Sequence, residues 1–134
     1  GIVGFSKAID ILRESIDINI SKRFSLRDYF LNKLQENIPK YVINGSLDNR
    51  ASGNINISFP GVDKEMIIMS MDLRGICISG GSACSSGAVE NSHVLESMGL
   101  DDELKNSAIR ISFSENNSFE EIDEFIIALK EIID

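Results

Sequence analysis

Cys84 stands in a short segment of small residues, residues 79–87, which reads SGGSACSSG. A thiolate nucleophile needs access to its target and a polar environment that favours the charged form. Glycines widen the allowed backbone angles and serines supply hydroxyl donors, so the pattern favours a mobile loop with a reactive thiol. The alternative is a small structural cysteine tucked under a loop. The other residues of this predicted mobile loop are Ser79, Gly80, Gly81, Ser82, Ala83, Ser85, Ser86 and Gly87.

Arg110 is the second candidate, because it stands inside the apolar strand pattern AIRIS. An arginine among apolar residues must find a partner or carry a large cost of burial. One solution is a bidentate contact with a carboxylate, either from a protein side chain or from a ligand. The other is an outward-pointing, solvated side chain, and the residues alone leave both open.

Two further side chains have chemical potential but weaker context. His93 is the only histidine, and at a helix start it is either a proton shuttle or a capping or surface residue. Cys77 lies between two isoleucines, which predicts a place in the core. No cluster of His, Cys and Asp has the spacing of a zinc site, so no metal is expected.

The length, composition and net charge of the chain limit the classes of protein to which it can belong. The chain has 134 residues, 43% of them hydrophobic, and a formal net charge of -8. One domain with a packed core is expected, and the acidic balance argues against a nucleic-acid or anionic-membrane surface. No apolar run could span a bilayer, no signal peptide is visible, and two cysteines suit a reducing cytoplasm.

The predicted elements give an α+β architecture, an α/β sandwich. A mainly antiparallel sheet of three to four short strands is covered by four or more helices. Ser25 and Asp28 predict a helix start, and Ser118 with Glu121 predicts a capping box. Helices are expected over residues 1–16, 25–38, 63–71, 92–98 and from 118 onward, with a helical turn at 101–104 and strands at 41–44, 54–59, 75–79 and 107–113.

The motifs SGGSACSSGAVENSHVLESMGL and SAIRISFSENNSFEEID together resemble the C-terminal part of NifS-type cysteine desulfurases. These are pyridoxal-phosphate enzymes of the class V aminotransferase fold. The earlier stretch YVINGSLDNRASGNINISFPG resembles the strand-turn-strand that precedes the cysteine loop in that family. The likeness covers nearly all of the chain.

The resemblance implies a reaction and two residue roles. By its match to the GSAC motif, Cys84 is the nucleophile that takes sulfur from L-cysteine as a persulfide and leaves alanine. By its match to the IRIS motif, Arg110 binds the substrate carboxylate. The sulfur then passes to an acceptor for iron–sulfur or thio-cofactor synthesis.

The chain departs from the family in two ways. Asn91 replaces the proline that usually precedes the Ser-His pair, and no lysine has the Ser-x-His-Lys setting of the cofactor lysine. Residues 1–134 are therefore expected to be the single small C-terminal domain, beginning within a connecting helix, without the large domain that holds pyridoxal phosphate. No cofactor is expected on this chain alone, and the isolated chain should be inactive. The implied partners are the missing large domain, a second copy in the parent homodimer, and a sulfur acceptor or iron–sulfur scaffold protein in the cytoplasm.

Three other readings stay open. The first is a selenocysteine lyase or an aminotransferase of the same fold, although a plain aminotransferase has no use for a mobile thiol. The second is a stand-alone persulfide carrier or docking module without a cofactor. The third is a structural module in which the thiol is inert.

Overall fold

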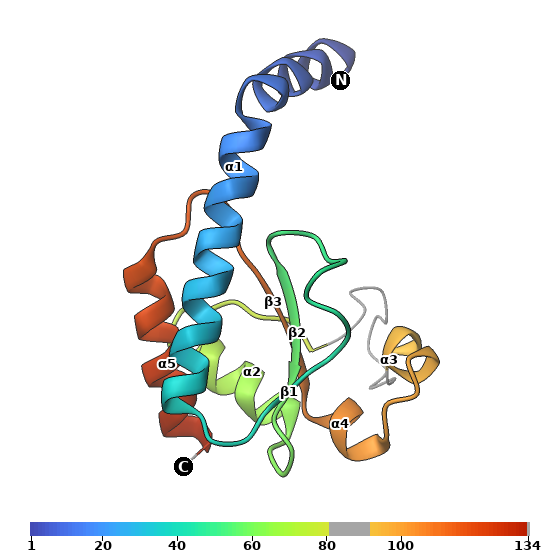
Figure 1. The fold of residues 1–134 in the computed structure, drawn as a ribbon, viewed down its shortest axis with the longest axis vertical. Helices are drawn as coiled ribbons and strands as arrows, with labels where there is room; N and C mark the ends of the chain where they lie inside the picture. The colour runs from blue at the N-terminus through green and yellow to red at the C-terminus, as the bar shows by residue number, and fades with distance from the viewer. Residues whose placement is uncertain (81–91, 134) are drawn as a thin grey trace.

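A three-stranded antiparallel sheet organises the fold, with its strands in the order β1-β2-β3. The computed structural model describes residues 1–80 and 92–133. The predicted α+β architecture is confirmed there (Figure 1). The elements are α1 (Ile2–Asn37), β1 (Val42–Ile43), β2 (Asn54–Ser58), α2 (Lys64–Asp72), α3 (His93–Ser97), α4 (Asp102–Asn106), β3 (Ala108–Ser112) and α5 (Phe119–Ile133).

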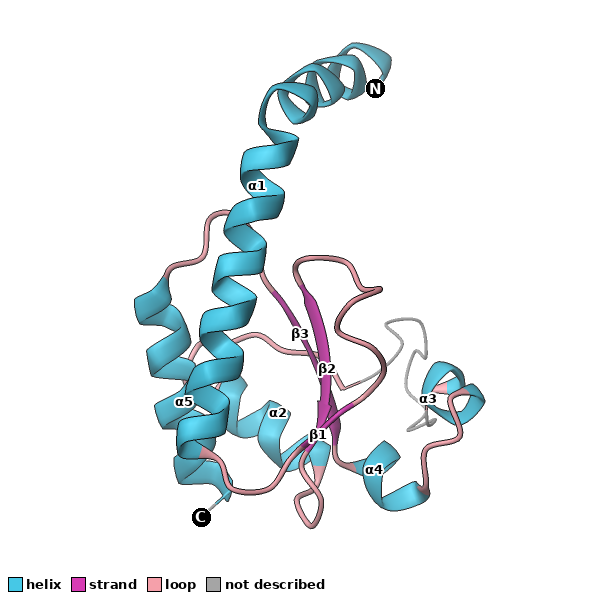
Figure 2. Cartoon of the chain, in the orientation of Figure 1, coloured by secondary structure: helices cyan, strands magenta, loops and turns pink. Residues whose placement is uncertain are grey.

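The sheet has an apolar face and a polar face because side chains alternate along each strand. On the apolar face, Ile55 pairs with Ile111 and Ile57 pairs with Ile109, and all four are buried. Helices α1, α2 and α5 lie on the same side of the sheet in Figure 2, and their side chains complete this core. The short helices α3 and α4 lie on the other side of the sheet.

Helix α1 is one continuous helix of 36 residues, so the prediction of separate helices over residues 1–16 and 25–38 was wrong. Ser25 does not cap a helix; its hydroxyl donates to the carbonyl of Ser21 at 3.1 Å, one turn back within α1. No glycine or proline occurs between residues 17 and 37, so nothing interrupts the hydrogen-bond ladder. The helix ends before Pro39, as expected, with Ile38 in an extended conformation.

Residues 75–79 do not form the predicted strand. A single bridge pairs Ser79 with Arg110, and Ile76 to Ile78 run as irregular chain. Alternation persists, because Ile76 and Ile78 pack against the core while Cys77 is exposed. The prediction that Cys77 is a core residue was therefore wrong, since only one side of this segment is covered.

The remaining helix signals were correct. Asp63 caps α2 by accepting from the backbone N–H groups of Glu65 and Met66, and Asp101 caps α4 through the N–H of Leu104. Within residues 1–80 and 92–133, no helix has the length and apolar character needed to cross a bilayer.

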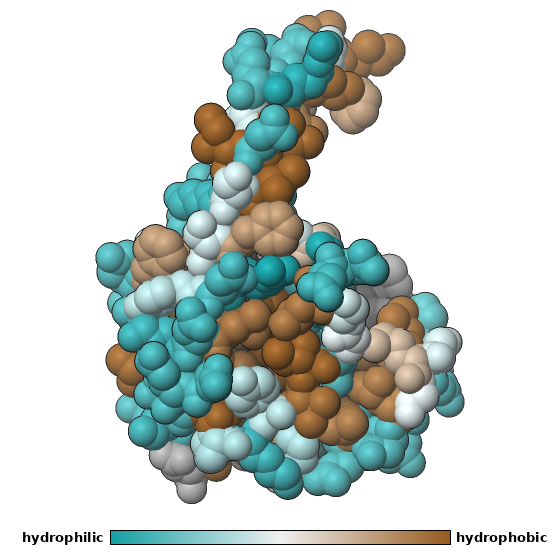
Figure 3. Space-filling view, viewed as in Figure 1, coloured by the Kyte–Doolittle hydropathy of each residue, from teal (hydrophilic) through white to brown (hydrophobic). Residues whose placement is uncertain are grey.

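The N-terminal half of α1 projects from the rest of the fold and carries exposed apolar side chains (Figure 3). The buried residues of α1 all come from its C-terminal half: Leu26, Phe30 and Leu34. A contiguous exposed apolar surface marks an interaction site or promotes association. The exposed large side chains of the projecting half are Ile2, Val3, Phe5, Ile9, Ile11, Leu12, Ile16 and Ile18.

We expect the double substitution of Phe5→Glu with Leu12→Glu to reduce self-association of the chain. These residues are seven apart, so they share one helix face, and neither is buried. The melting temperature should change little. Lys7→Glu is the matched control, because it makes the same change in net charge on the opposite face of the helix. Analytical ultracentrifugation measures the effect, and equal association of both variants would contradict it.

The capping box at the start of α5 forms as predicted. Ser118 Oγ accepts from the backbone N–H of Glu121 at 3.2 Å, and Glu121 Oε2 accepts from the N–H of Ser118 at 3.1 Å. The Asn117 side-chain amide donates to the same carboxylate oxygen at 2.9 Å. The hydrogen bonds to the carboxylate, first from the Asn117 amide and then from the Ser118 backbone N–H, favour the charged form and lower the pKa of Glu121.

This cap predicts a pH dependence of stability. Because the folded-state pKa of Glu121 is depressed, its contribution is present above the unfolded pKa and is lost as pH falls through the folded pKa. We expect Glu121→Gln to melt below the wild type at neutral pH, with the difference closing in acid. Glu120→Gln, which removes a first-turn carboxylate that accepts no hydrogen bond among the described residues, is the matched control, and thermal melts should show a smaller loss for it at neutral pH.

Candidate functional site

The polar face of the sheet borders a cavity of about 280 Å³. Arg110 on β3 lies directly opposite Asn56 on β2, so both side chains project from this face. Side chains from α3 and from residues 44–50 close the other sides. The described residues that line this Arg110 cavity are Asn44, Arg50, Asn54, Asn56, Ser92, Val94, Leu95, Met98 and Arg110.

Arg110 is half-buried, and its backbone N–H and C=O groups both bond to the backbone of Ser79. It pairs with Asn56 across the ladder and with Ser79 across the isolated bridge. Its Nη2 makes a long contact of 3.5 Å with the Ser79 hydroxyl. No acidic side chain in residues 1–80 or 92–133 forms an ion pair with Arg110. The guanidinium is therefore available to an anion in the cavity.

Asn44 connects the cavity to the sheet. It is only 3% exposed, and its Nδ2 donates to Asn56 Oδ1 at 2.7 Å and to Ser58 Oγ at 2.8 Å. The Ser58 hydroxyl donates in turn to the carbonyl of Leu104 at 2.8 Å. The four groups form a continuous hydrogen-bonded chain from α4 to the cavity wall.

Arg50 closes the turn between β1 and β2. Its Nε donates to the carbonyl of Ser46 at 2.9 Å, and its Nη2 donates to the carbonyl of Asn44. Desolvation, with a smaller repulsion from Arg27, lowers the pKa of Arg50. Gly45 adopts a φ of 84°, and a Cβ there would lie 2.9 Å from Arg50 Nη2, so the turn requires glycine.

The structure brings together some of the predicted site residues and leaves others apart. Ser79 contacts Arg110, and Gly80 follows it against Ile68. Cys84 and its neighbours Gly81, Ser82, Ala83, Ser85, Ser86 and Gly87 lie outside the described residues. His93 is exposed at the first position of α3 and is not among the residues that line the cavity.

Sequence reasoning missed Asn44, Arg50 and Asn56 as members of the site. The alternation of NINIS placed Asn56 opposite the buried isoleucines. Knowledge of the β2–β3 register was needed to put that polar face beside Arg110.

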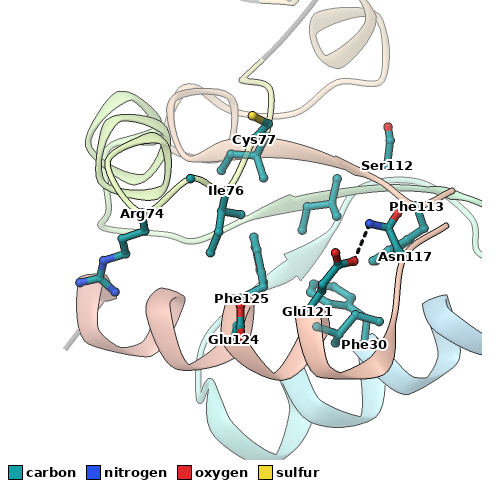
Figure 4. Close-up of a pocket in the computed structure, with 14 residues that line it drawn as sticks. Phe30, Arg74, Ile76, Cys77, Ser112, Phe113, Asn117, Glu121, Glu124 and Phe125 are labelled. Carbon is teal, nitrogen blue, oxygen red and sulfur yellow. Dashed lines mark hydrogen bonds between the residues drawn. The ribbon is translucent and has the colours of Figure 1, made fainter.

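A second cavity, of about 360 Å³, lies between α5 and residues 74–78 (Figure 4). Its lining is mainly core side chains, including Phe30, Ile122 and Phe125, with Cys77 at its edge. Two of its polar side chains are engaged in other interactions: Glu121 in the α5 cap, and Arg74 in an ion pair with Glu131 at 2.9 Å. This cavity is larger than the Arg110 cavity, and the one basic side chain in its described lining, Arg74, is already paired.

The described lining of the Arg110 cavity does not fit pyridoxal phosphate. That cofactor is held through a lysine amine, with a charged partner for its pyridine nitrogen. The described lining contains no lysine and no acidic side chain. In residues 1–80 and 92–133, no cluster of three His, Cys, Asp or Glu side chains could hold a metal ion.

Known proteins resemble this chain over nearly its whole length. The model of the aminotransferase class-V family matches residues 1–125. The chain is 37% identical over 134 residues to the cysteine desulfurase IscS of Dictyoglomus turgidum, covering all of this chain and 34% of that protein. It is 42% identical over 129 residues to IscS of Methylobacillus flagellatus, covering 96% of this chain and 31% of that one.

Solved structures show the same likeness. A NifS-like protein superposes with a TM-score of 0.83 at 27% identity, covering 99% of this chain and 33% of its own. The NifS-like protein from Rickettsia africae gives a TM-score of 0.82 at 32% identity, covering 98% of this chain and 33% of its own. The chain thus spans about a third of the length of these relatives.

We expect Asn44→Ala to lower the free energy of unfolding by about 1–3 kcal/mol, because Asn56 Oδ1 and Ser58 Oγ lose their shared donor. Urea denaturation measures the loss. The exposed Asn106→Ala should change stability by about 0.5 kcal/mol or less. Equal stability of the two variants would show that the Asn44 bonds contribute nothing.

Proposed function

Since the chain belongs to the aminotransferase class-V family, whose members depend on pyridoxal phosphate, we propose that it is the C-terminal part of a cysteine desulfurase. In this proposal Arg110 binds the substrate carboxylate and Cys84 accepts the sulfur. The observation that carries it is the pairing of Ser79 with Arg110. Ser79 is the first residue of the segment 79–87, which contains Cys84, so this segment begins beside the strand that carries Arg110.

Arg110 has the properties of a carboxylate receptor. Its planar guanidinium presents paired N–H donors that match the two oxygens of a carboxylate. It is half-buried, so its charge is less screened than that of a surface arginine, and it borders a cavity. The alternative of a merely solvated side chain suits this setting less well.

Cys84 is tethered close to the same cavity by the sequence. It follows Ser79 by five residues, and a chain spans at most about 3.6 Å per residue, so the tether is about 18 Å or shorter. Ser92, which follows Cys84 in the sequence, also lines the cavity. A thiol on such a tether can reach a substrate whose carboxylate Arg110 holds.

The Cys84 thiolate bonds to the sulfur of L-cysteine, and the Cβ–S bond of the substrate breaks with its electron pair left on carbon. That carbon takes up a proton, so alanine forms while Cys84 becomes a persulfide. The persulfide then gives its outer sulfur to an acceptor, for iron–sulfur or thio-cofactor synthesis. A reducing cytoplasm suits a thiol that must be regenerated after each transfer.

In a protein as long as these relatives, the groups that hold pyridoxal phosphate would come from the other two thirds of the chain. The chain spans about a third of its relatives, and the Arg110 cavity shows no lysine in its described lining. We therefore infer that a large domain, a second copy of the enzyme and a sulfur acceptor are the working partners. The isolated chain is expected to make no alanine from L-cysteine.

The test is a chimera in which this chain replaces the matching C-terminal third of the Dictyoglomus turgidum desulfurase. We expect alanine formation from L-cysteine and a persulfide on Cys84. Cys84→Ser should abolish both, while Cys77→Ser, the matched control at the other cysteine, should retain them. Arg110→Lys should raise KM about tenfold or more, because lysine cannot reproduce the bidentate contact.

Two results would contradict the proposal. One is a folded, cofactor-loaded chimera that forms no alanine. The other is unchanged activity in the Cys84→Ser variant. If the inactive chimera's chain still accepted persulfide from a separate, complete desulfurase, the chain would be a sulfur carrier instead.

A further inference from the structure

We propose that Asn56 is a second anion-binding residue, and that its side-chain amide donates a hydrogen bond to the carboxylate that Arg110 binds. This inference rests on the proposed role of Arg110. Asn56 would help to position the substrate through a hydrogen bond from a neutral group, without an ion pair.

The strand register places the two side chains together. Asn56 and Arg110 are directly opposite partners in the β2–β3 ladder. Side chains that pair in this way leave the same face of a sheet with their Cβ atoms about 4.5–5.5 Å apart. Both residues line the same cavity. One small anion can therefore contact both at once.

The hydrogen-bond chain fixes which atom Asn56 turns toward Asn44. The Leu104 carbonyl can only accept, so the Ser58 hydroxyl, 2.8 Å away, must donate to it. Ser58 Oγ then has only lone pairs left for Asn44, which must offer its nitrogen. The second hydrogen on that nitrogen points to Asn56, so Asn56 presents Oδ1 there.

This orientation leaves the Asn56 Nδ2 group for the cavity. Within residues 1–80 and 92–133, Nδ2 donates to no other group, and Asn56 is half-buried at the cavity wall. A half-buried amide donor beside an arginine that has no acidic partner among the described residues is suited to an anionic oxygen acceptor. Asn44 and Ser58 act as positioning residues, since they prevent the amide from turning its oxygen toward the anion.

The experiment uses the whole chain, labelled with ¹⁵N, and sodium acetate as the carboxylate probe. Sodium chloride at equal ionic strength is the blank. We expect the Arg110 Nε–H signal and the Asn56 side-chain amide signals to shift together along one saturation curve. Asn56→Ala should weaken acetate binding about tenfold, the usual effect of losing a hydrogen bond to a charged group.

Asn106→Ala is the matched control, because Asn106 is exposed at the end of α4 and is not among the residues that line the cavity. The acetate affinity of this variant should stay within about twofold of the wild type. A second variant, Asn56→Asp, keeps an oxygen toward Asn44 and places a carboxylate beside Arg110, so acetate binding should be lost.

The outcomes separate this inference from the function it rests on. If the Arg110 signal responds to acetate while the Asn56 amide does not, and Asn56→Ala binds normally, the role of Asn56 is wrong and that of Arg110 stands. If the Arg110 signal does not respond, the carboxylate role of Arg110 fails and the inference fails with it. The amide shift of the wild type decides the question even if a variant does not fold.

Discussion

The pairing of β2 with β3 is the interaction on which the rest of the structure depends. Its register sets Ile55 and Ile57 against Ile109 and Ile111 on one face, where α1, α2 and α5 bury them. The same register sets Asn56 against Arg110 on the other face. A slip of one residue would send the polar side chains into the core, so the hydrophobic core itself holds the candidate site in place.

The position of Arg110 in the middle of this ladder reduces the conformational entropy that is lost when its side chain is fixed. A long, flexible side chain loses conformational entropy when it is fixed, and a surface arginine gains little in return. The ladder with β2 fixes the strand that carries Arg110, and the backbone groups of Arg110 itself bond to Ser79, so only its side chain has to be ordered. The bridge to Ser79 also places the first residue of the Cys84-containing segment, residues 79–87, beside Arg110.

The sequence predicted what local chemistry determines and failed where tertiary contacts decide. The α5 capping box depends on neighbours three residues apart, and it formed as expected. Ser25 has the same local signature, but the residues around it contain no helix breaker and α1 runs through it. Cys77 has the apolar neighbours of a core residue, but its side chain is exposed in the part of the chain that the structure describes. The Asn44 chain joins segments far apart in the sequence, so no short motif could predict it.

The acidic balance of the chain makes the short-range donors of the cavity more important. A net charge of -8 gives no long-range attraction for a carboxylate, although screening limits its repulsion to about 8–10 Å at physiological salt. A free amino acid such as L-cysteine is a zwitterion with no net charge near neutral pH, so it is steered little in either direction. Its binding must then come from contacts made at the site. Under the proposed function, that is the physical reason for a paired arrangement of one cationic and one neutral donor, Arg110 and Asn56, held by the same ladder.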